Sequence, residues 1–368
     1  MTIVKEKITS RGLLFACASF VQASTLLTAY FLAPLKQNAW IGVIVGYVIS
    51  LAVVHMYFAL YDMHRGKNLV EIGEAVFGRV GGKLFGALYG FYFFTLAILN
   101  ISTINGFVTS MLMPQTPPWV LALLFLFPCI LAARKGLDAI TRFGPLLCVF
   151  HLIAILSFFG LLTSILNPSN LLPILHMPVK KFVQGVSTIV SLPLCDTVCF
   201  LMIIPYVEEG RHLKRSFIAG LSVGACTLLL IVFADIMTLG AAATYFSFPE
   251  YQTLRLINLA EVFSHMETTY ALLHFMMRFF KMAVLLYVCA LTLAQLCHLR
   301  VYAPLVAVIG VFAGLLSLFD FPSASEAAEW GINTASVYAS VFTILLPAIA
   351  LIVSSVRAHI AKKGAVAA

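Results

Sequence analysis

The sequence predicts an all-α integral membrane protein with about ten transmembrane helices. Hydrophobic residues make up 61% of the 368 residues and charged residues only 10%, a composition well outside that of ordinary water-soluble domains. Uncharged runs that are long enough to cross a bilayer recur from one end of the chain to the other. We therefore expect residues 1–368 to form one transporter-like membrane domain.

Each predicted span is an apolar run with few or no charges, bounded by charged or turn-forming residues. The ten runs cover residues 12–35, 40–61, 84–113, 118–133, 143–166, 182–207, 216–243, 268–297, 301–319 and 332–356. The first run follows a basic segment, as a signal peptide would, but its length and the many later spans indicate a retained helix.

The distribution of basic residues predicts the orientation in the membrane. Most of the 23 Lys and Arg residues fall in the N-terminal segment, the C-terminal segment and the connections on the same side of the membrane. By the positive-inside rule, both termini are expected to be cytoplasmic. The net charge of +8 is then a consequence of topology, and nucleic-acid binding is not indicated.

Two connections carry helical patterns. Asn68 is followed three residues later by Glu71, which predicts a capping box and a short amphipathic cytoplasmic helix. On the outer side, Pro249 and Glu250 open a segment that continues to Glu267. We expect an outer helix there, which either covers an external entrance or lies flat at the membrane interface.

Asp196 is the one charge in the run 182–207. An unpaired charge at the bilayer centre costs roughly 2.5 to 3.5 kcal/mol, and a proline such as Pro193 frees a backbone carbonyl that lipid cannot satisfy. Asp196 should therefore face a cavity, a partner charge or a ligand. Cys195 and Cys199 are one turn apart, but nothing completes a set of metal ligands, so no metal or other cofactor is expected.

The centres of the first and sixth spans are both polar. Transporters built from two inverted repeats bind substrate between interrupted helices at corresponding positions of the two halves. The predicted repeats are residues 12–166 and 182–356. The candidate substrate-binding residues at the two centres are Gln22, Ser24, Thr25 and Thr28 in the first span, and Pro193, Cys195, Asp196 and Thr197 in the sixth. Alternatively, the Ser and Thr hydroxyls bond only to their own helix backbone.

The eighth span carries Arg278 and Lys281 on the same helical face as His274. At ~1.5 Å per residue, Lys281 lies about 20 Å and Arg278 about 15 Å from the outer surface, against about 21 Å for Asp196. A charge pair between Asp196 and either base is therefore predicted. It either pins two helices together or provides a fixed cation in place of a coupling ion such as Na⁺, while Asp196 engages the ligand or exchanges protons.

Other polar side chains in the spans have simpler interpretations. Asn100 and Thr103 either line the same cavity or bridge helices. Asp235 and Asp320 fall near the outer ends of their spans, where we expect them to reach interfacial water. His151 is a lone histidine in an apolar run, and we expect a backbone carbonyl to satisfy it.

Three segments together resemble a known family. They are Ala132-Ala133-Arg134-Lys135-Gly136-Leu137, the sixth-span segment Met202-Ile203-Ile204-Pro205-Tyr206, and Phe248-Pro249-Glu250 with the residues that follow. They look like the spore germination permeases, the B subunits of nutrient germinant receptors. The resemblance implies the LeuT-like fold of 5+5 inverted repeats found in the amino acid/polyamine/organocation transporter superfamily. It also implies sensing of a small nutrient, often an amino acid, in the inner spore membrane with an A-type membrane subunit and a C-type lipoprotein.

Two functions remain open from the sequence. The first is a receptor subunit in which a small nutrient, bound at the membrane midplane, shifts a conformational equilibrium that partner subunits detect. The second is a proton-coupled amino acid transporter that uses Asp196. The sequence contains no nucleotide-binding loop, nucleophile constellation or metal motif, so an enzyme is not expected.

Overall fold

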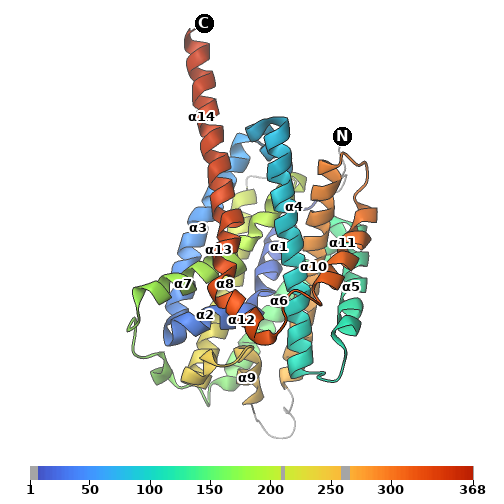
Figure 1. Ribbon diagram of the computed structural model, residues 1–368. Coiled ribbons are helices and arrows are strands. Elements are labelled where there is room, and N and C mark those ends of the chain that lie inside the picture. Colours follow the sequence, from blue (N-terminus) through green and yellow to red (C-terminus); the bar gives the residue numbers. More distant parts are fainter. Residues whose placement is uncertain (1–6, 209–211, 258–265, 368) are drawn as a thin grey trace.

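The computed structural model describes residues 7–208, 212–257 and 266–367. Within these residues the chain is helical apart from its connections, and the one pairing of extended segments is a bridge between Ile8 and Val207. The helices lie side by side in a single bundle, and the chain begins and ends at the same end of it (Figure 1). We call this end the terminal end, and the opposite end the far end.

The first half of the chain supplies five of the predicted spans. The helices are α1 (Ser10–Gln22) with η1 (Thr25–Leu27) and α2 (Thr28–Leu35), α3 (Ala39–Met63), α4 (Leu69–Met111), α5 (Pro118–Lys135) and α6 (Leu137–Leu162). A short turn, η2 (Lys36–Asn38), joins α2 to α3.

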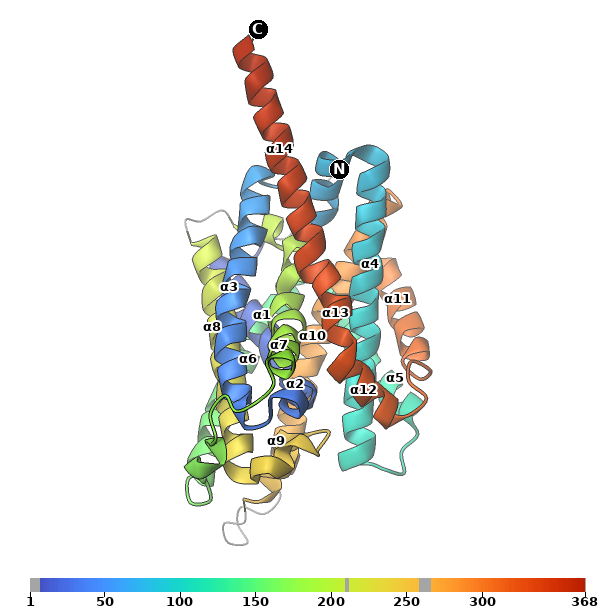
Figure 2. The same cartoon turned by 60° about the vertical axis from the view of Figure 1, so that its left-hand side comes forward.

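The second half supplies the other five. They are α7 (Val179–Ile189) with η4 (Val190–Leu194), η5 (Cys195–Met202) and η6 (Ile204–Tyr206), then α8 (Leu213–Leu239) with η7 (Gly240–Thr244), α10 (Met266–Leu296), α11 (Ala303–Leu316), and α13 (Ala335–Ser340) with η9 (Val341–Leu345) and α14 (Leu346–Ala367). The last of these, α14, projects past the rest of the bundle at the terminal end (Figure 2).

The described residues form eight helices that are long and apolar enough to cross a membrane. This number is compatible with ten predicted spans, because the segment Ser10–Met63 joins the first two and α11 is only a shorter apolar helix. The bundle thus has the multi-pass helical architecture that the hydropathy pattern predicts.

Two spans are broken near their centres, and the sequence explains both breaks. In the first, Ser24 leaves helical geometry (φ −90°, ψ 0°), and the Thr25 hydroxyl donates to the Gln22 carbonyl at 2.9 Å. In the second, Pro193 lies in the wide turn η4. Proline lacks the N–H that a regular helix needs, so the regular helix is interrupted there. Side-chain hydroxyls form hydrogen bonds with backbone carbonyls that lack a helical partner at each break. These bonds stabilise both breaks inside the bundle.

The predicted cytoplasmic helix forms the first part of α4. Asn68 and Glu71 make the capping box, with the Asn68 side chain accepting from the Glu71 N–H at 3.1 Å and the Glu71 carboxylate accepting from the Asn68 N–H at 2.9 Å. Gly78 then takes φ +76°, which glycine adopts without steric cost. The chain bends there and continues as the third span.

The outer segment after Pro249 forms α9 (Pro249–Arg255) at the far end (Figure 1). An interfacial helix would expose one polar face, but Glu250, Thr253 and Leu254 are all buried because α9 packs against α8 and α10. Residues 258–265 of the predicted outer helix lie outside the described residues. A second short helix, α12 (Ala324–Asn333), contacts α2.

Close packing of α1 on α8 gives a test of the fold. A Cβ atom on Gly220 would lie 2.3 Å from the Leu14 carbonyl oxygen and 2.9 Å from Cys17 Cβ. We expect Gly220→Ala to lower the free energy of unfolding by roughly 1 to 3 kcal/mol, the usual cost of overpacking. Thermal unfolding of the purified protein in detergent measures this.

The matched control is Gly160→Ala in α6, where a Cβ atom meets nothing within 4 Å. It should be neutral or stabilising by up to about 1 kcal/mol, because alanine favours helix. Equal stability of the two variants would contradict the close contact between α1 and α8.

Candidate functional site

A cavity of about 510 Å³ occupies the middle of the bundle. Its wall comes from α2, α4, the connection between η7 and α9, and α12, and four charged side chains line it: Asp196, Arg278, Lys281 and Asp320. Tyr245 also lines it and is 86% exposed, which places the opening towards the far end. The volume falls within the usual range for small-molecule sites.

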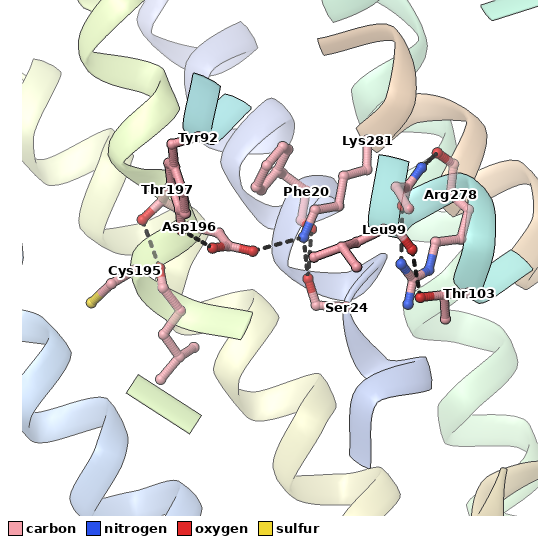
Figure 3. A network of polar contacts seen from close by, with 12 residues as sticks. Phe20, Ser24, Tyr92, Leu99, Thr103, Cys195, Asp196, Thr197, Arg278 and Lys281 are labelled. Carbon is pink, nitrogen blue, oxygen red and sulfur yellow. Dashed lines mark hydrogen bonds and ion pairs between the residues drawn. The ribbon is translucent and has the colours of Figure 1, made fainter. Parts of the chain in front are cut away.

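Asp196 lies in η5 with 2% of its surface exposed. Its Oδ1 accepts a hydrogen bond from the Tyr92 hydroxyl at 2.7 Å, and its Oδ2 accepts one from Lys281 Nζ at 3.3 Å (Figure 3). Both carboxylate oxygens therefore have partners. Of the two bases that the sequence offered, the structure pairs Asp196 with Lys281.

Lys281 joins the two broken spans. Its ammonium also donates to Ser24 Oγ at 2.8 Å and lies 4.6 Å from the centre of the Phe20 ring (Figure 3). Phe20 precedes the break in the first span and Ser24 lies in it, whereas Asp196 follows the break in the sixth span. The ammonium is thus held by a carboxylate, a hydroxyl and an aromatic face, which are the partners a buried cation requires.

Arg278 is held along only one edge. Its Nη1 donates to Asn100 Oδ1 at 2.9 Å, and Asn100 Nδ2 donates back to the Arg278 carbonyl at 3.3 Å. Its Nε and Nη2 have no hydrogen-bond partner among the described residues, although the side chain is 2% exposed and lines the cavity. A guanidinium with two adjacent N–H groups free matches a carboxylate in a bidentate geometry.

The structure divides the predicted site residues into two groups. Five line the cavity: Asn100, Thr103, Asp196, Arg278 and Lys281. The other seven are buried behind its wall: Gln22, Ser24, Thr25, Thr28, Pro193, Cys195 and Thr197.

The residues behind the wall support the breaks. Gln22 Nε2 donates to Thr227 Oγ1 at 3.0 Å, which ties the end of α1 to α8. Thr197 Oγ1 donates to the Leu194 carbonyl at 2.6 Å, and the Cys195 carbonyl accepts from the Tyr57 hydroxyl at 3.4 Å. These contacts satisfy backbone carbonyls around the sixth-span break.

Two residues at or beside the cavity were not among the predicted site residues. Tyr92, which contacts Asp196, lies three helical turns before Thr103 and on the same face of α4, and this spacing could have identified it. Asp320, which we expected to reach interfacial water, is half-buried and lines the cavity. Its Oδ1 accepts the Phe321 N–H at 2.9 Å, and its Oδ2 has no partner within the described part of the chain.

The expectations for Asp235 and His151 were wrong. Asp235 does not reach water: it is 1% exposed, and its Oδ1 accepts from the Thr253 hydroxyl at 2.7 Å. The packing of α9 over the end of α8 explains the difference. His151 is not bonded to a carbonyl. Neither of its ring nitrogens has a hydrogen-bond partner among the described residues, and its ring lies beside that of His274, with centroids 5.8 Å apart.

A family model for spore germination proteins matches residues 7–324, so the chain belongs to the spore germination permease family. Spore germination protein KB of Bacillus subtilis (strain 168) is 25% identical over 358 residues, covering 95% of each chain. Spore germination protein A2 of the same organism is 23% identical over 217 residues, covering 59% of this chain and 57% of that protein. The resemblance found in the sequence is confirmed.

Solved structures of transporters share the fold. MHP1, a nucleobase-cation-symport-1 family transporter, superposes with a TM-score of 0.64 at 12% identity, covering 91% of this chain and 75% of that one. A Na⁺-coupled sialic acid symporter gives 0.63 at 12% identity, covering 90% and 79%. The predicted LeuT-like fold class is therefore confirmed.

The Asp196–Lys281 pair gives a second prediction. Lys281→Met leaves a buried carboxylate without its cation, and we expect it to cost roughly 3 to 5 kcal/mol. Combining it with Asp196→Asn should restore much of the stability, because the uncompensated charge is gone. A double-mutant cycle on thermal unfolding of the purified protein measures the coupling.

Lys180→Met, at an exposed position, is the matched control and should unfold like the wild type. Additive losses in the Lys281→Met and Asp196→Asn double variant would show that the two charges are independent, contrary to the contact.

Proposed function

We propose that this protein is the permease-like subunit of a nutrient germinant receptor, which binds a small nutrient with a carboxylate, most simply an amino acid, in the central cavity. The observation that supports this proposal is that Arg278 is buried with two of its nitrogens unpaired among the described residues. A buried guanidinium costs free energy unless its N–H groups are paired, and the two N–H groups that Asn100 leaves free fit a ligand carboxylate.

An amino group on the same ligand has a partner of opposite charge. Asp320 lines the cavity and has one carboxylate oxygen, Oδ2, without a partner among the described residues. Asp196 is less suited to this contact, because Tyr92 and Lys281 already occupy both of its oxygens. A zwitterion would then pair its carboxylate with Arg278 and its ammonium with Asp320.

The position of Lys281 favours sensing over transport. Its ammonium connects Ser24 to Asp196 and is covalently part of α10, so it cannot dissociate as a coupling Na⁺ would. A ligand that binds one conformation of such a protein better shifts the conformational equilibrium without an ion gradient. Partner subunits would detect that shift. By family, these partners are an A-type membrane subunit and a C-type lipoprotein in the inner spore membrane, with the far end outside and both termini cytoplasmic.

The second candidate is a proton-coupled amino acid transporter. It is favoured by the fold that the chain shares with the MHP1 transporter and the sialic acid symporter. In that case Asp196 would carry the proton and release Lys281 during each cycle.

Ligand chemistry tests the binding proposal. In a thermal-shift panel, α-amino acids should stabilise the purified protein, whereas their amides should not, because an amide lacks the carboxylate that Arg278 binds. Arg278→Gln should weaken binding of the best amino acid by roughly 10- to 100-fold, the usual effect of losing a hydrogen bond to a charged group. Asp320→Asn should reduce the preference for amino acids over simple carboxylic acids.

Arg134→Gln, which changes an exposed arginine on α5, is the control and should leave affinity unchanged. Unaltered affinity in Arg278→Gln would contradict the assignment of the carboxylate to this residue.

An uptake measurement separates the two candidate functions. For a receptor, proteoliposomes containing the purified protein should bind a labelled amino acid but not accumulate it, with or without a pH gradient. Accumulation that depends on the gradient and disappears in Asp196→Asn would establish the transporter instead.

A further inference from the structure

Glu250 on α9 belongs to a second buried polar cluster, apart from the contacts of Asp196. It is 3% exposed, and neither carboxylate oxygen has a hydrogen bond of good geometry within the described residues. A bare carboxylate in such surroundings is strongly disfavoured relative to the protonated acid. The burial of Glu250 therefore points to a bound proton.

Among the described residues, the elements packed around α9 do not supply a full counter-charge. From α8, the nearby ionisable group is Asp235, a second acid with one unpartnered oxygen. From α10, the groups are Tyr270, His274 and Arg278. The guanidinium of Arg278 acts on Glu250 only through its field, because no hydrogen bond joins the two. From α4, the contacts with α9 are uncharged.

His274 lies next to Glu250, and its hydrogen bonds fit a neutral ring. Its Nε2 lies 2.8 Å from Thr25 Oγ1 and 3.4 Å from Glu250 Oε1. Since Thr25 donates its own hydrogen to the Gln22 carbonyl, Nε2 carries the hydrogen that Thr25 accepts. The other nitrogen, Nδ1, has no partner among the described residues, and the His151 ring lies beside the His274 ring. A second proton on His274 would have no acceptor.

The space beside Glu250 is too small for anything larger than water. A cavity of about 20 Å³ is lined by Asp235, Glu250, Thr253 and Tyr270 together with apolar side chains, and about one water fits such a volume. The described residues contain no group of three His, Cys, Asp or Glu side chains placed to hold a metal ion. The ligand class that fits is therefore the proton.

We propose that Glu250 is a proton-binding site, separate from the Asp196–Lys281 pair, whose protonated form seats α9 against α8 and α10. The proton comes from and returns to water, and no covalent step is involved. Burial raises the pKa of Glu250 to about 7, against the opposing effects of the Tyr270 hydroxyl and the Arg278 charge. The site thus changes occupancy near neutral pH.

The position of α9 makes this site relevant to the cavity. Phe248, the residue before α9, lines the central cavity and packs edge-on against Phe107 with ring centroids 5.1 Å apart. Tyr251 packs against the same ring at 5.6 Å. Loss of the proton leaves a buried negative charge beside Asp235, which loosens α9 and with it the cavity wall that Phe248 forms.

Heat stability as a function of pH tests the proposal without any nutrient. The pKa of Glu250 is higher in the folded protein than in the unfolded chain, where a glutamate has a pKa of about 4.3. The stabilising effect of the proton is therefore complete below about pH 4 and is lost as pH rises through about 7. The Tm of the wild type should fall between pH 5 and pH 8, and Glu250→Gln, which mimics the protonated acid, should remove this fall.

The expected pattern is specific. At pH 8 Glu250→Gln should melt above the wild type, and at pH 5 the two should coincide, while Glu329→Gln, at an exposed position on α12, follows the wild type throughout. A pH slope that persists in Glu250→Gln but vanishes in Asp235→Asn would overturn the proposal in favour of Asp235.

Hydrogen exchange provides an independent measurement on the wild type, in case Glu250→Gln does not fold. After correction for the intrinsic rate, backbone protection of the peptide covering α9 should fall as pH rises from 6 to 8. Protection that stays constant over this range would overturn the proposal. Both measurements are independent of what binds in the central cavity, so a failed nutrient panel leaves them interpretable.

Discussion

The contact of Lys281 with Asp196 and Ser24 is the interaction on which the centre of this protein depends. Each broken span leaves backbone groups and side chains that lipid cannot satisfy, and Lys281 contacts a residue at each break. One ammonium, held at 2.8 Å from Ser24 and 3.3 Å from Asp196, connects the two. Removing two charges from water is costly, and the additional hydroxyl and the Phe20 ring make the arrangement stable.

Arg278 differs from Lys281 in how completely its N–H groups are paired. Lys281 and Asp196 bond to each other, and their other hydrogen bonds go to Ser24 and Tyr92. Arg278 is fixed in place by Asn100 along one edge, and its remaining N–H groups are left without a partner in the described chain. A rigid guanidinium that is already desolvated binds an anion with little further cost, because both its position and its dehydration precede the ligand.

The sequence predicts those features of the fold that depend on local pattern or on depth in the membrane. Hydropathy locates the spans, and the capping box at Asn68 needs only residues that are three apart. Equal depth pairs Asp196 with a base on the eighth span, but depth cannot choose between Arg278 and Lys281, which are three residues apart and both long enough to reach. The structure decides by placing Asn100 next to Arg278.

The features that the sequence did not predict depend on contacts between distant segments. Asp235 was expected at water because it lies near the end of its span, yet α9 folds back and covers it, with Thr253 donating to its carboxylate. The ring nitrogens of His151, which have no partner among the described residues, also reflect packing between distant segments. The approach of α6 to α10 places the His151 ring against His274. No periodicity in one sequence reports such packing.

One face of α10 unites the two sites. Tyr270, His274, Arg278 and Lys281 recur at intervals of three or four residues and therefore lie on a single stripe of this helix. Its far-end part meets Glu250, and its central part reaches the cavity and Asp196. A small rotation of α10 changes the surroundings of both sites together, because a rigid helix does not move one turn without the next. Any change in proton affinity that a ligand causes through this helix must be matched by an equal change in ligand affinity caused by the proton.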